Sequence, residues 1–442
     1  MGKTDWKAEA KTLKKSLKVL QAAAAPVVMV KNAKPVSPLA PASFPALPRI
    51  AGVEFSAVEA GVRYANRKDV MLVRLAPGTA MAGVFTRSTT RSASVRECQA
   101  NLTIKVPAGA GAAILVNSGN SNAFTGAIGD QAVAQIVNGV ADALGVPASR
   151  VFTSSTGVIG EPLPFARITD KIPDLLADLR DDAIDMAAQA IMTTDTFPKG
   201  ASAVVQGDGG TIHIAGIAKG SGMIAPDMAT MLVYIFTDAK IPAASLQKML
   251  SRNVDATFNA ITVDSDTSTS DTLLLAATGQ SAAAEVKGPV AKVFEAALHG
   301  VMMDLAHQVV RDGEGATKFV EVRVTGAASN ADAQKVAMAV ANSPLVKTAI
   351  AGQDPNWGRV VMAVGKSGAQ AERDLLTIRF GNMVVAKNGW RNPDYSEDAT
   401  AVYMKNAELV IGVDLGLGTG KRSVWTCDLT NRYIEINADY RS

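Results

Sequence analysis

The threonine at position 230 is the residue in this chain best placed to do chemistry. It closes the segment Asp227-Met228-Ala229-Thr230 and precedes an apolar run that begins at Met231. If the bond between Ala229 and Thr230 were cut, Thr230 would carry a hydroxyl nucleophile and a free α-amine able to act as its base. One cleavage would then create a catalyst without any histidine. Taken alone, however, Ala-Thr before a strand is common, and the preceding Gly-Ser-Gly usually marks only a turn.

The composition narrows the class of protein. The 442 residues are 48% hydrophobic, which suits two or three domain-sized units or one large body. Lys+Arg 44 nearly balance Asp+Glu 41, and this argues against a nucleic-acid-binding face. Cys98 and Cys427 are too few for a disulfide framework and favour a reducing compartment. No apolar stretch reaches the about 20 residues needed to span a bilayer.

The three histidines are weak candidates for catalysis or metal binding. His213 lies in a strand-like run, and His299 and His307 lie in a helix-like run without the spacing of a metal pair. The acidic run Asp264–Asp271 lacks the glycine and the closing glutamate of a calcium loop. We therefore expect structural roles for the histidines, no metal site and no resident cofactor.

Short strands and helices must position Thr230. Apolar runs predict strands at 70–75, 112–116, 151–153, 201–206, 211–218, 231–236, 272–277, 318–324, 375–379, 408–413, 423–426 and 433–436. Helices are predicted at 133–144, 246–258 and from Pro289 to about Gly313. The pattern is α+β, with strands in hairpin-like succession around Thr230.

The N-terminal 40 residues differ from the rest. Apolar residues recur at helical spacing from Trp6 to Leu20 among lysines, and six prolines follow from Pro26 to Pro48. This predicts a basic amphipathic helix and a stiff linker. A mitochondrial presequence is one interpretation, although Asp5 and Glu9 intrude and arginine is absent there. A solvated extension or a docking arm fits as well.

Six polar, glycine-bearing clusters interrupt the apolar pattern. They are Asn117–Asn122, Ser154–Gly160, Met192–Thr196, Asp264–Asp271, Gly313–Lys318 and Asp354–Arg359. Each alone is more often a turn than a site. Together, because they are rich in hydroxyls and amides, they predict one solvated cleft. A Thr-Gly pair at a strand end, such as Thr156-Gly157, can offer a hydroxyl and a backbone N–H to an oxyanion.

Several motifs in one order resemble the ornithine acetyltransferases of arginine biosynthesis, the ArgJ family. They are Thr156-Gly157, Met192–Thr196, Lys219–Leu232, Gly313–Lys318, Asp354–Arg359 and Ile436–Ser442, and the resemblance spans residues 40 to 442. It implies an α+β fold similar to the N-terminal-nucleophile enzymes, with stacked β-sheets flanked by helices. It also implies self-cleavage between Ala229 and Thr230. Residues 1–40 would be an extension, 41–229 the α chain and 230–442 the β chain, interlocked in one body and paired as a heterotetramer.

The resemblance further implies an activity and its residues. The family moves the acetyl group of N2-acetylornithine to glutamate through an acetyl-threonine, and many members also take acetyl-CoA, which stays open here as a co-substrate. Thr230 matches the nucleophile, and Thr156 and Gly157 match the oxyanion hole. The substrate-binding positions match Thr193, Lys219, Thr230, Glu314, Asn437 and Ser442, the last in place of the threonine expected there.

Two of these positions have a physical rationale of their own. Glu314 suits the cationic end of ornithine, and Lys219, on a strand facing an apolar core, would need a ligand or a charge partner. A surface strand end is the plainer interpretation of Lys219.

Alternatives to the transferase remain. One is an N-terminal-nucleophile aminopeptidase or amidohydrolase with water as acceptor, and another is an uncut binding protein. We expect small-molecule substrates, no nucleic acid or membrane partner, and a cytoplasmic location, or the mitochondrial matrix if the arm is a presequence.

Overall fold

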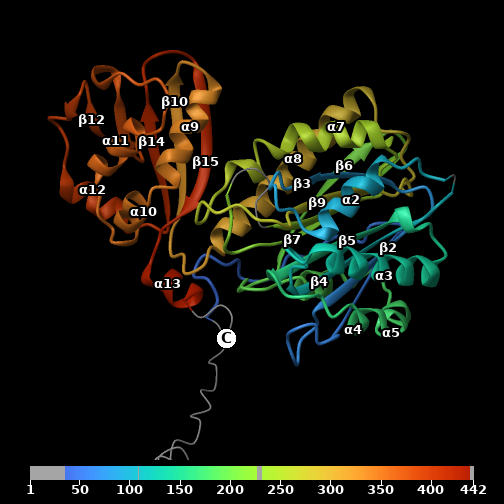
Figure 1. Ribbon diagram of the computed structural model, residues 1–442. Helices are drawn as coiled ribbons and strands as arrows, with labels where there is room; N and C mark the ends of the chain where they lie inside the picture. Colours follow the sequence, from blue (N-terminus) through green and yellow to red (C-terminus); the bar gives the residue numbers. More distant parts are fainter. Residues whose placement is uncertain (1–34, 108, 226–230, 439–442) are drawn as a thin grey trace, which may run out of the picture. The chain divides into compact units, whose positions relative to one another are not determined.

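Three β-sheets form the framework of the computed structural model, which describes residues 35–107, 109–225 and 231–438 (Figure 1). By its internal contacts the chain divides into Met1–Val36 and Ser37–Ser442, and all three sheets belong to the second unit. Three residues predicted for the site, Ala229, Thr230 and Ser442, lie outside the described residues.

The first sheet has four strands in the order β1-β2-β4-β5. Its strands are β1 (Val53–Val58), β2 (Val70–Leu75), β4 (Ala112–Asn120) and β5 (Val151–Val158). The β1–β2 and β2–β4 pairs are antiparallel, whereas β4 and β5 are parallel. Both faces of this sheet are apolar, because alternate residues of each strand enter two different cores.

The second sheet has five strands in the order β3-β9-β8-β7-β6. They are β3 (Ala80–Phe85), β6 (Lys199–Gly207), β7 (Gly210–Lys219), β8 (Leu232–Thr237) and β9 (Thr272–Ala277). Strands from before and after position 230 therefore share this sheet, and β8 joins β7 in antiparallel register from Lys219↔Leu232 to Ile214↔Thr237.

These two sheets pack face to face, and helices cover their outer faces (Figure 1). Phe55 of β1 and Phe236 of β8 meet edge to face at 5.2 Å between ring centroids in the shared core. The helices α3 (Gly126–Leu144), α4 (Phe165–Thr169) and α5 (Ile172–Ala177) cover the first sheet, and α7 (Ala243–Val254) and α8 (Gly288–Arg311) cover the second. Residues of α2 (Ala93–Thr103) and α6 (Ile184–Ala190) complete the core between the sheets.

The C-terminal part of the chain forms a third sheet with its own core, drawn in orange and red in Figure 1. The strand order is β13-β12-β11-β14-β10-β15. The strands are β10 (Phe319–Ala327), β11 (Thr377–Phe380), β12 (Met383–Lys387), β13 (Trp390–Arg391), β14 (Glu408–Asp414) and β15 (Gly420–Cys427). The helices are α9 (Asn330–Ala341), α10 (Pro344–Ala351), α11 (Trp357–Gly365), α12 (Glu397–Met404) and α13 (Asn431–Asn437). Short 3-10 turns occur at η1 (Ala148–Arg150), η2 (Phe258–Ala260) and η3 (Arg373–Leu375).

The predicted α+β fold with stacked sheets flanked by helices is confirmed, while two local predictions need correction. The segment 433–436, predicted as a strand, lies in helix α13, which the Thr430 side chain caps by accepting from the Arg432 N–H. Four residues are too few to separate a strand from a helix by periodicity. The strands β4 and β5 also run on into the polar clusters, where Ser155 Oγ donates to Asn117 Oδ1 at 2.7 Å.

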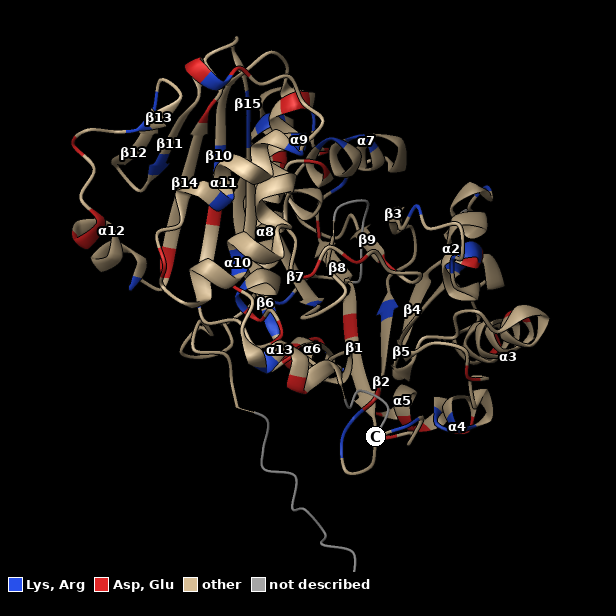
Figure 2. Ribbon diagram, turned by 60° about the vertical axis from the view of Figure 1, so that its left-hand side comes forward, with Lys and Arg blue, Asp and Glu red and all other residues tan. Residues whose placement is uncertain are grey.

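Charged side chains outside the cores form ion pairs, and the two cysteines lie inside the cores. Lysines, arginines and acids are scattered along helices and strands of all three sheets (Figure 2); Glu54 of β1, for example, pairs with Arg74 directly opposite on β2. His213 pairs with Asp238 at 3.0 Å between Nδ1 and Oδ2. Cys98 and Cys427 are buried free thiols. Within the described residues, no helix combines the length and apolarity needed to cross a membrane.

Candidate active site

Side chains from distant parts of the chain meet in a cavity of about 110 Å³. Of the residues predicted for the site, six line this cavity: Thr156, Gly157, Thr193, Lys219, Glu314 and Asn437. The other described residues that line it are Ser121, Ile159, Thr194, Gly222, Met223, Ser268, Thr269 and Ser270. Hydroxyl groups thus dominate the lining, with one lysine and one glutamate among them.

Five of the six polar clusters contribute to this cavity, as the predicted solvated cleft requires. The sixth, Asp354–Arg359, does not line it. That cluster forms the start of α11 instead, where the Asn356 side chain accepts from the Arg359 N–H as the helix cap. The prediction was wrong for this cluster because a cap and a binding loop use the same polar residues.

The pair Thr156-Gly157 lies at the end of β5, beside Ser118 and Gly119 of β4. Gly157 has φ 133°, and a Cβ placed on it would lie 2.2 Å from the Gly119 carbonyl carbon. No side chain fits there. The two strand ends therefore lie close together, and the Gly157 backbone borders the cavity without a side chain to cover it.

Glu314 supplies the acidic wall of the cavity. Its Oε2 accepts from Asn437 Nδ2 at 2.6 Å, and its backbone N–H donates to the Ser221 carbonyl at 3.0 Å. A Cβ on Gly222 would lie 2.4 Å from the Glu314 carboxyl carbon. The carboxyl group can therefore occupy this position only because residue 222 is glycine. Asn437 comes from α13, and the C-terminal helix thus reaches the same cavity.

Lys219, at the end of β7, is 2% exposed. Its nearest carboxylate oxygen is Asp195 Oδ2, at 3.8 Å from Nζ. Burial lowers the pKa of the ammonium group, and Lys199 adds to this effect while Asp195, Glu314 and Asp271 oppose it. The predicted charge partner of Lys219 is therefore present, and the surface interpretation is wrong.

The sequence also matches proteins of known family. The ArgJ family model matches residues 54–442. The chain belongs to the ArgJ family. It is 66% identical over 407 residues to the arginine biosynthesis bifunctional protein ArgJ of Ruegeria pomeroyi, covering 92% of this chain and 98% of that protein. It is 54% identical over 413 residues to the protein of the same name from Nitrobacter winogradskyi, covering 92% and 99%. The crystal structure of the Bacillus halodurans bifunctional protein is 42% identical, covers 46% of this chain and 95% of that chain, and gives a TM-score of 0.44.

The predicted resemblance to ArgJ is thereby confirmed, and the chain is an acyltransferase of arginine biosynthesis. The roles of its individual site residues stay predictions. The structure brings six of them to one cavity.

Beside the candidate site lies a buried ionic network that the sequence analysis did not predict. Lys199 Nζ donates to Asp195 Oδ1 at 2.7 Å and to Asp312 Oδ2 at 2.6 Å, and all three side chains are fully buried. Although burial opposes ionisation, Lys199 and Lys219 hold the pKa of Asp195 below its ordinary value. The signal in the sequence was Asp195 itself, inside the Met192–Thr196 motif, but nothing local indicated its partner Asp312.

Two further acids flank the segment that leads to position 230. Asp271 is fully buried, and its Oδ1 accepts from the Met231 N–H at 2.8 Å. Burial raises the pKa of this carboxyl well above its ordinary range and favours the neutral form. Asp264 accepts from the Ile224 N–H at 2.9 Å, and burial raises its pKa to about 6. Both acids lie in the Asp264–Asp271 cluster, which here orders the backbone on either side of residues 226–230.

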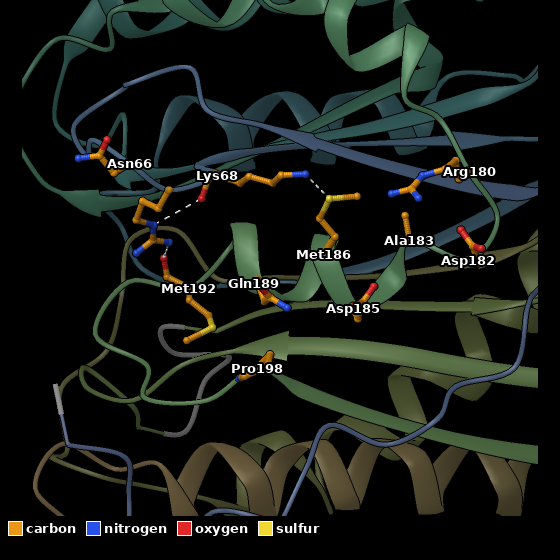
Figure 3. A pocket seen from close by; sticks show the side chains of 11 residues that line it. Asn66, Lys68, Arg180, Asp182, Ala183, Asp185, Met186, Gln189, Met192 and Pro198 are labelled. Carbon is orange, nitrogen blue, oxygen red and sulfur yellow. Dashed lines mark hydrogen bonds between the residues drawn. The ribbon is translucent and has the colours of Figure 1, made fainter. Parts of the chain in front are cut away.

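A wider hollow of about 940 Å³ lies on another part of the surface (Figure 3). Its lining includes Lys68, Arg180, Asp185 and Met186, and Arg67 donates there to the Met192 carbonyl at 2.6 Å. It holds none of the predicted catalytic residues that the structure describes, so the smaller cavity is the candidate site. In the described part of the chain, no group of three or more His, Cys, Asp or Glu side chains is arranged to hold a metal ion.

Proposed function

We propose that this enzyme transfers the acetyl group of N2-acetylornithine to glutamate through an acetyl ester on Thr230, after cleaving itself between Ala229 and Thr230. The observation that carries the proposal is the cavity itself. It joins the Thr156-Gly157 pair to one buried cation, Lys219, and one carboxylate, Glu314. Strand β8 begins two residues after Thr230 and pairs with the strand that ends at Lys219.

Self-cleavage would be an acyl shift followed by hydrolysis. The Thr230 hydroxyl attacks the Ala229 carbonyl, and the amide nitrogen leaves with a proton, so that an ester replaces the peptide bond. This shift frees the Thr230 α-amine, and water then hydrolyses the ester, which releases the Thr230 hydroxyl and leaves Ala229 with a carboxylate. Strands of the second sheet come from both sides of this bond, so the two products would stay together in one body. Pairing of two such bodies as a heterotetramer is part of the proposal.

Acetyl transfer would use the same hydroxyl twice. The α-amine, whose pKa is ordinarily about 7.7–8.0, takes the hydroxyl proton while Thr230 Oγ attacks the acetyl carbonyl of N2-acetylornithine. Thr156 Oγ1 and the Gly157 N–H would stabilise the oxyanion. The proton passes to the departing nitrogen, and ornithine leaves.

The second half of the cycle would regenerate the enzyme. The glutamate amine attacks the acetyl ester, and the proton returns to Thr230 Oγ as N-acetylglutamate forms. Glu314 would bind the side-chain ammonium of ornithine, whereas Lys219, Thr193, Asn437 and Ser442 would bind the amino-acid head. Acetyl-CoA would enter, if used, as an alternative acetyl donor to the same hydroxyl, and we propose the cytoplasm as the compartment.

The test is the intact mass of the denatured protein followed by an assay with and without glutamate. We expect two fragments that meet between Ala229 and Thr230, and ornithine release that depends on glutamate. Release in water alone would favour an amidohydrolase. A single full-length chain without turnover would remove Thr230 as the nucleophile.

The Thr230→Ala variant should remain one chain and release no ornithine, because both reactions need the hydroxyl. The matched control is Thr348→Ala, which removes a threonine hydroxyl from the exposed surface of α10. We expect that variant to be cut and active like the parent protein. Normal turnover by Thr230→Ala would overturn the mechanism.

A further inference from the structure

The cavity contains two predicted substrate-binding residues, Thr193 and Lys219, that are joined behind its wall by one side chain. That side chain is Asp195, which is fully buried. Its Oδ2 accepts from the Thr193 N–H at 3.0 Å and lies 3.8 Å from Lys219 Nζ. Its Oδ1 accepts from the Gly220 N–H at 2.7 Å and from Lys199 Nζ at 2.7 Å. Both carboxylate oxygens therefore accept hydrogen bonds from the protein, and Asp195 is satisfied without a ligand.

These contacts connect two segments that are separated in the sequence. Thr193 follows helix α6, whereas Lys219 ends strand β7 and Gly220 follows it. Because Asp195 accepts a backbone N–H from each segment, its carboxylate holds Thr193 next to the end of β7, in addition to the pairing of β6 with β7.

The charge of Asp195 matters as much as its hydrogen bonds. Lys219 faces the cationic Lys199 and the acids Glu314 and Asp271 in addition to Asp195. Burial and Lys199 both disfavour its ammonium form, and Asp195 is the foremost of the groups that favour it. Within the described residues, no hydrogen bond from Lys219 Nζ to a protein acceptor is formed, so its donors are available to an anionic ligand group.

We infer that Asp195 is a positioning residue of the transferase, which fixes the spacing of Thr193 and Lys219 and keeps Lys219 as an ammonium ion for the carboxylate of the amino-acid substrate. This inference rests on the proposed function. It assigns to Asp195 a role through Lys219, without contact to the substrate.

Asp312 provides the matched control. It also pairs with Lys199, at 2.6 Å, and is equally buried, but its carboxylate otherwise accepts from the backbone N–H and the hydroxyl of Thr196, which lies outside the cavity lining. Asp195→Asn and Asp312→Asn each take one carboxylate from Lys199. Only the first takes the carboxylate from Lys219.

The experiment measures kcat/KM for N2-acetylornithine against pH in the parent protein and both variants, since this profile reports the ionisations of the free enzyme. In Asp195→Asn we expect KM to rise about 10- to 100-fold, the range for a charge-assisted hydrogen bond. We also expect the alkaline limb to move about one unit or more toward lower pH, because Lys219 loses its proton more easily. Lowering the pH should restore activity in this variant. Asp312→Asn should keep the alkaline limb of the parent protein.

A general loss of structure would give a different result. Equal losses in the two Asn variants, with no shift of the alkaline limb, would overturn the inference. Should Asp195→Asn fail to fold, Lys219→Arg decides, because a guanidinium stays charged over the whole range and should move the alkaline limb to higher pH. An unchanged limb in Lys219→Arg would also overturn the inference. Absence of transfer in the parent protein would instead refute the proposed function, so the two failures are distinguishable.

Discussion

Two buried lysines at the same end of one β-hairpin differ in how their charge is satisfied. Lys199 opens β6 and pairs in register with Ala218, the neighbour of Lys219 at the end of β7. Lys199 has three acceptors, at 2.7, 3.3 and 2.6 Å. Lys219 has one carboxylate oxygen, at 3.8 Å. Since a buried ammonium group without acceptors is costly, the charge of Lys199 is compensated by its protein acceptors, and we propose that a ligand completes the compensation at Lys219.

We therefore expect the replacement of each lysine by methionine to have different effects on unfolding free energy and on turnover. Lys199→Met leaves Asp195 and Asp312 buried together without their shared cation, and we expect a loss of about 3–5 kcal/mol in unfolding free energy. Lys219→Met removes a charge that the protein satisfies poorly, so its stability should change by less than half as much while turnover falls roughly 100-fold. Urea unfolding in the uncut Thr230→Ala background, together with turnover of the cut variants, measures both effects.

Two other lysines, one exposed and one buried outside the cavity, provide controls. Lys335→Met breaks an exposed pair with Asp332 and should leave the unfolding free energy nearly unchanged, because solvent screens such a pair. Lys347→Met removes a buried lysine that donates to Thr426 Oγ1 at 2.9 Å outside the cavity, and should lower stability without a specific loss of turnover. A Lys219→Met variant less stable than Lys199→Met would contradict the proposed difference between the two lysines.

The same pair of lysines shows what the sequence could and could not predict. Lys219 was identifiable because it begins a glycine-rich motif and sits on an apolar strand. Lys199 was not, since a lysine at a strand start is usually exposed. Its burial arises from Asp312, which comes from the end of α8, and no local pattern encodes such a long-range contact. Most strands were predicted from their apolar runs, whereas β1, β3, β12 and β13 were not predicted. The short segment 433–436 was wrongly predicted as a strand, because the helix cap at Thr430 decided its structure.

A Glu314 variant tests whether the cavity binds the charge of the substrate. The Glu314→Gln variant keeps an oxygen for Asn437 Nδ2 but removes the negative charge from the cavity. We expect KM for N2-acetylornithine to rise roughly tenfold, because the hydrogen bond to the substrate ammonium is no longer charge-assisted. KM for glutamate should not rise, since glutamate has no side-chain ammonium. Steady-state kinetics with each substrate varied in turn separate the two values.

The matched control for this change is Glu408→Gln. Glu408 is exposed and pairs with Arg311 at 2.7 Å, away from the cavity. Its replacement should leave both KM values unchanged. Equal increases in KM for both substrates in Glu314→Gln would mean that Glu314 supports the cavity wall and does not bind the ammonium group of the substrate.

A third group, the partly buried carboxyl of Glu97, has no cationic partner among the residues that the structure describes. Glu97 of α2 accepts from Thr153 Oγ1 at 3.2 Å, and burial raises its pKa to about 7. Because its folded-state pKa lies above the unfolded value of 4.5, its contribution to stability is present at low pH and is lost as the pH rises through about 7. Glu97→Gln should therefore stabilise the chain at pH 8 by about 1–2 kcal/mol relative to its effect at pH 5, less than the full shift would give, because the side chain keeps some contact with water. Urea unfolding at both pH values measures this difference. An equal effect at pH 5 and pH 8 would show that Glu97 does not titrate with folding, and that a lone hydroxyl donor satisfies a buried charge as fully as the carboxylates satisfy Lys199.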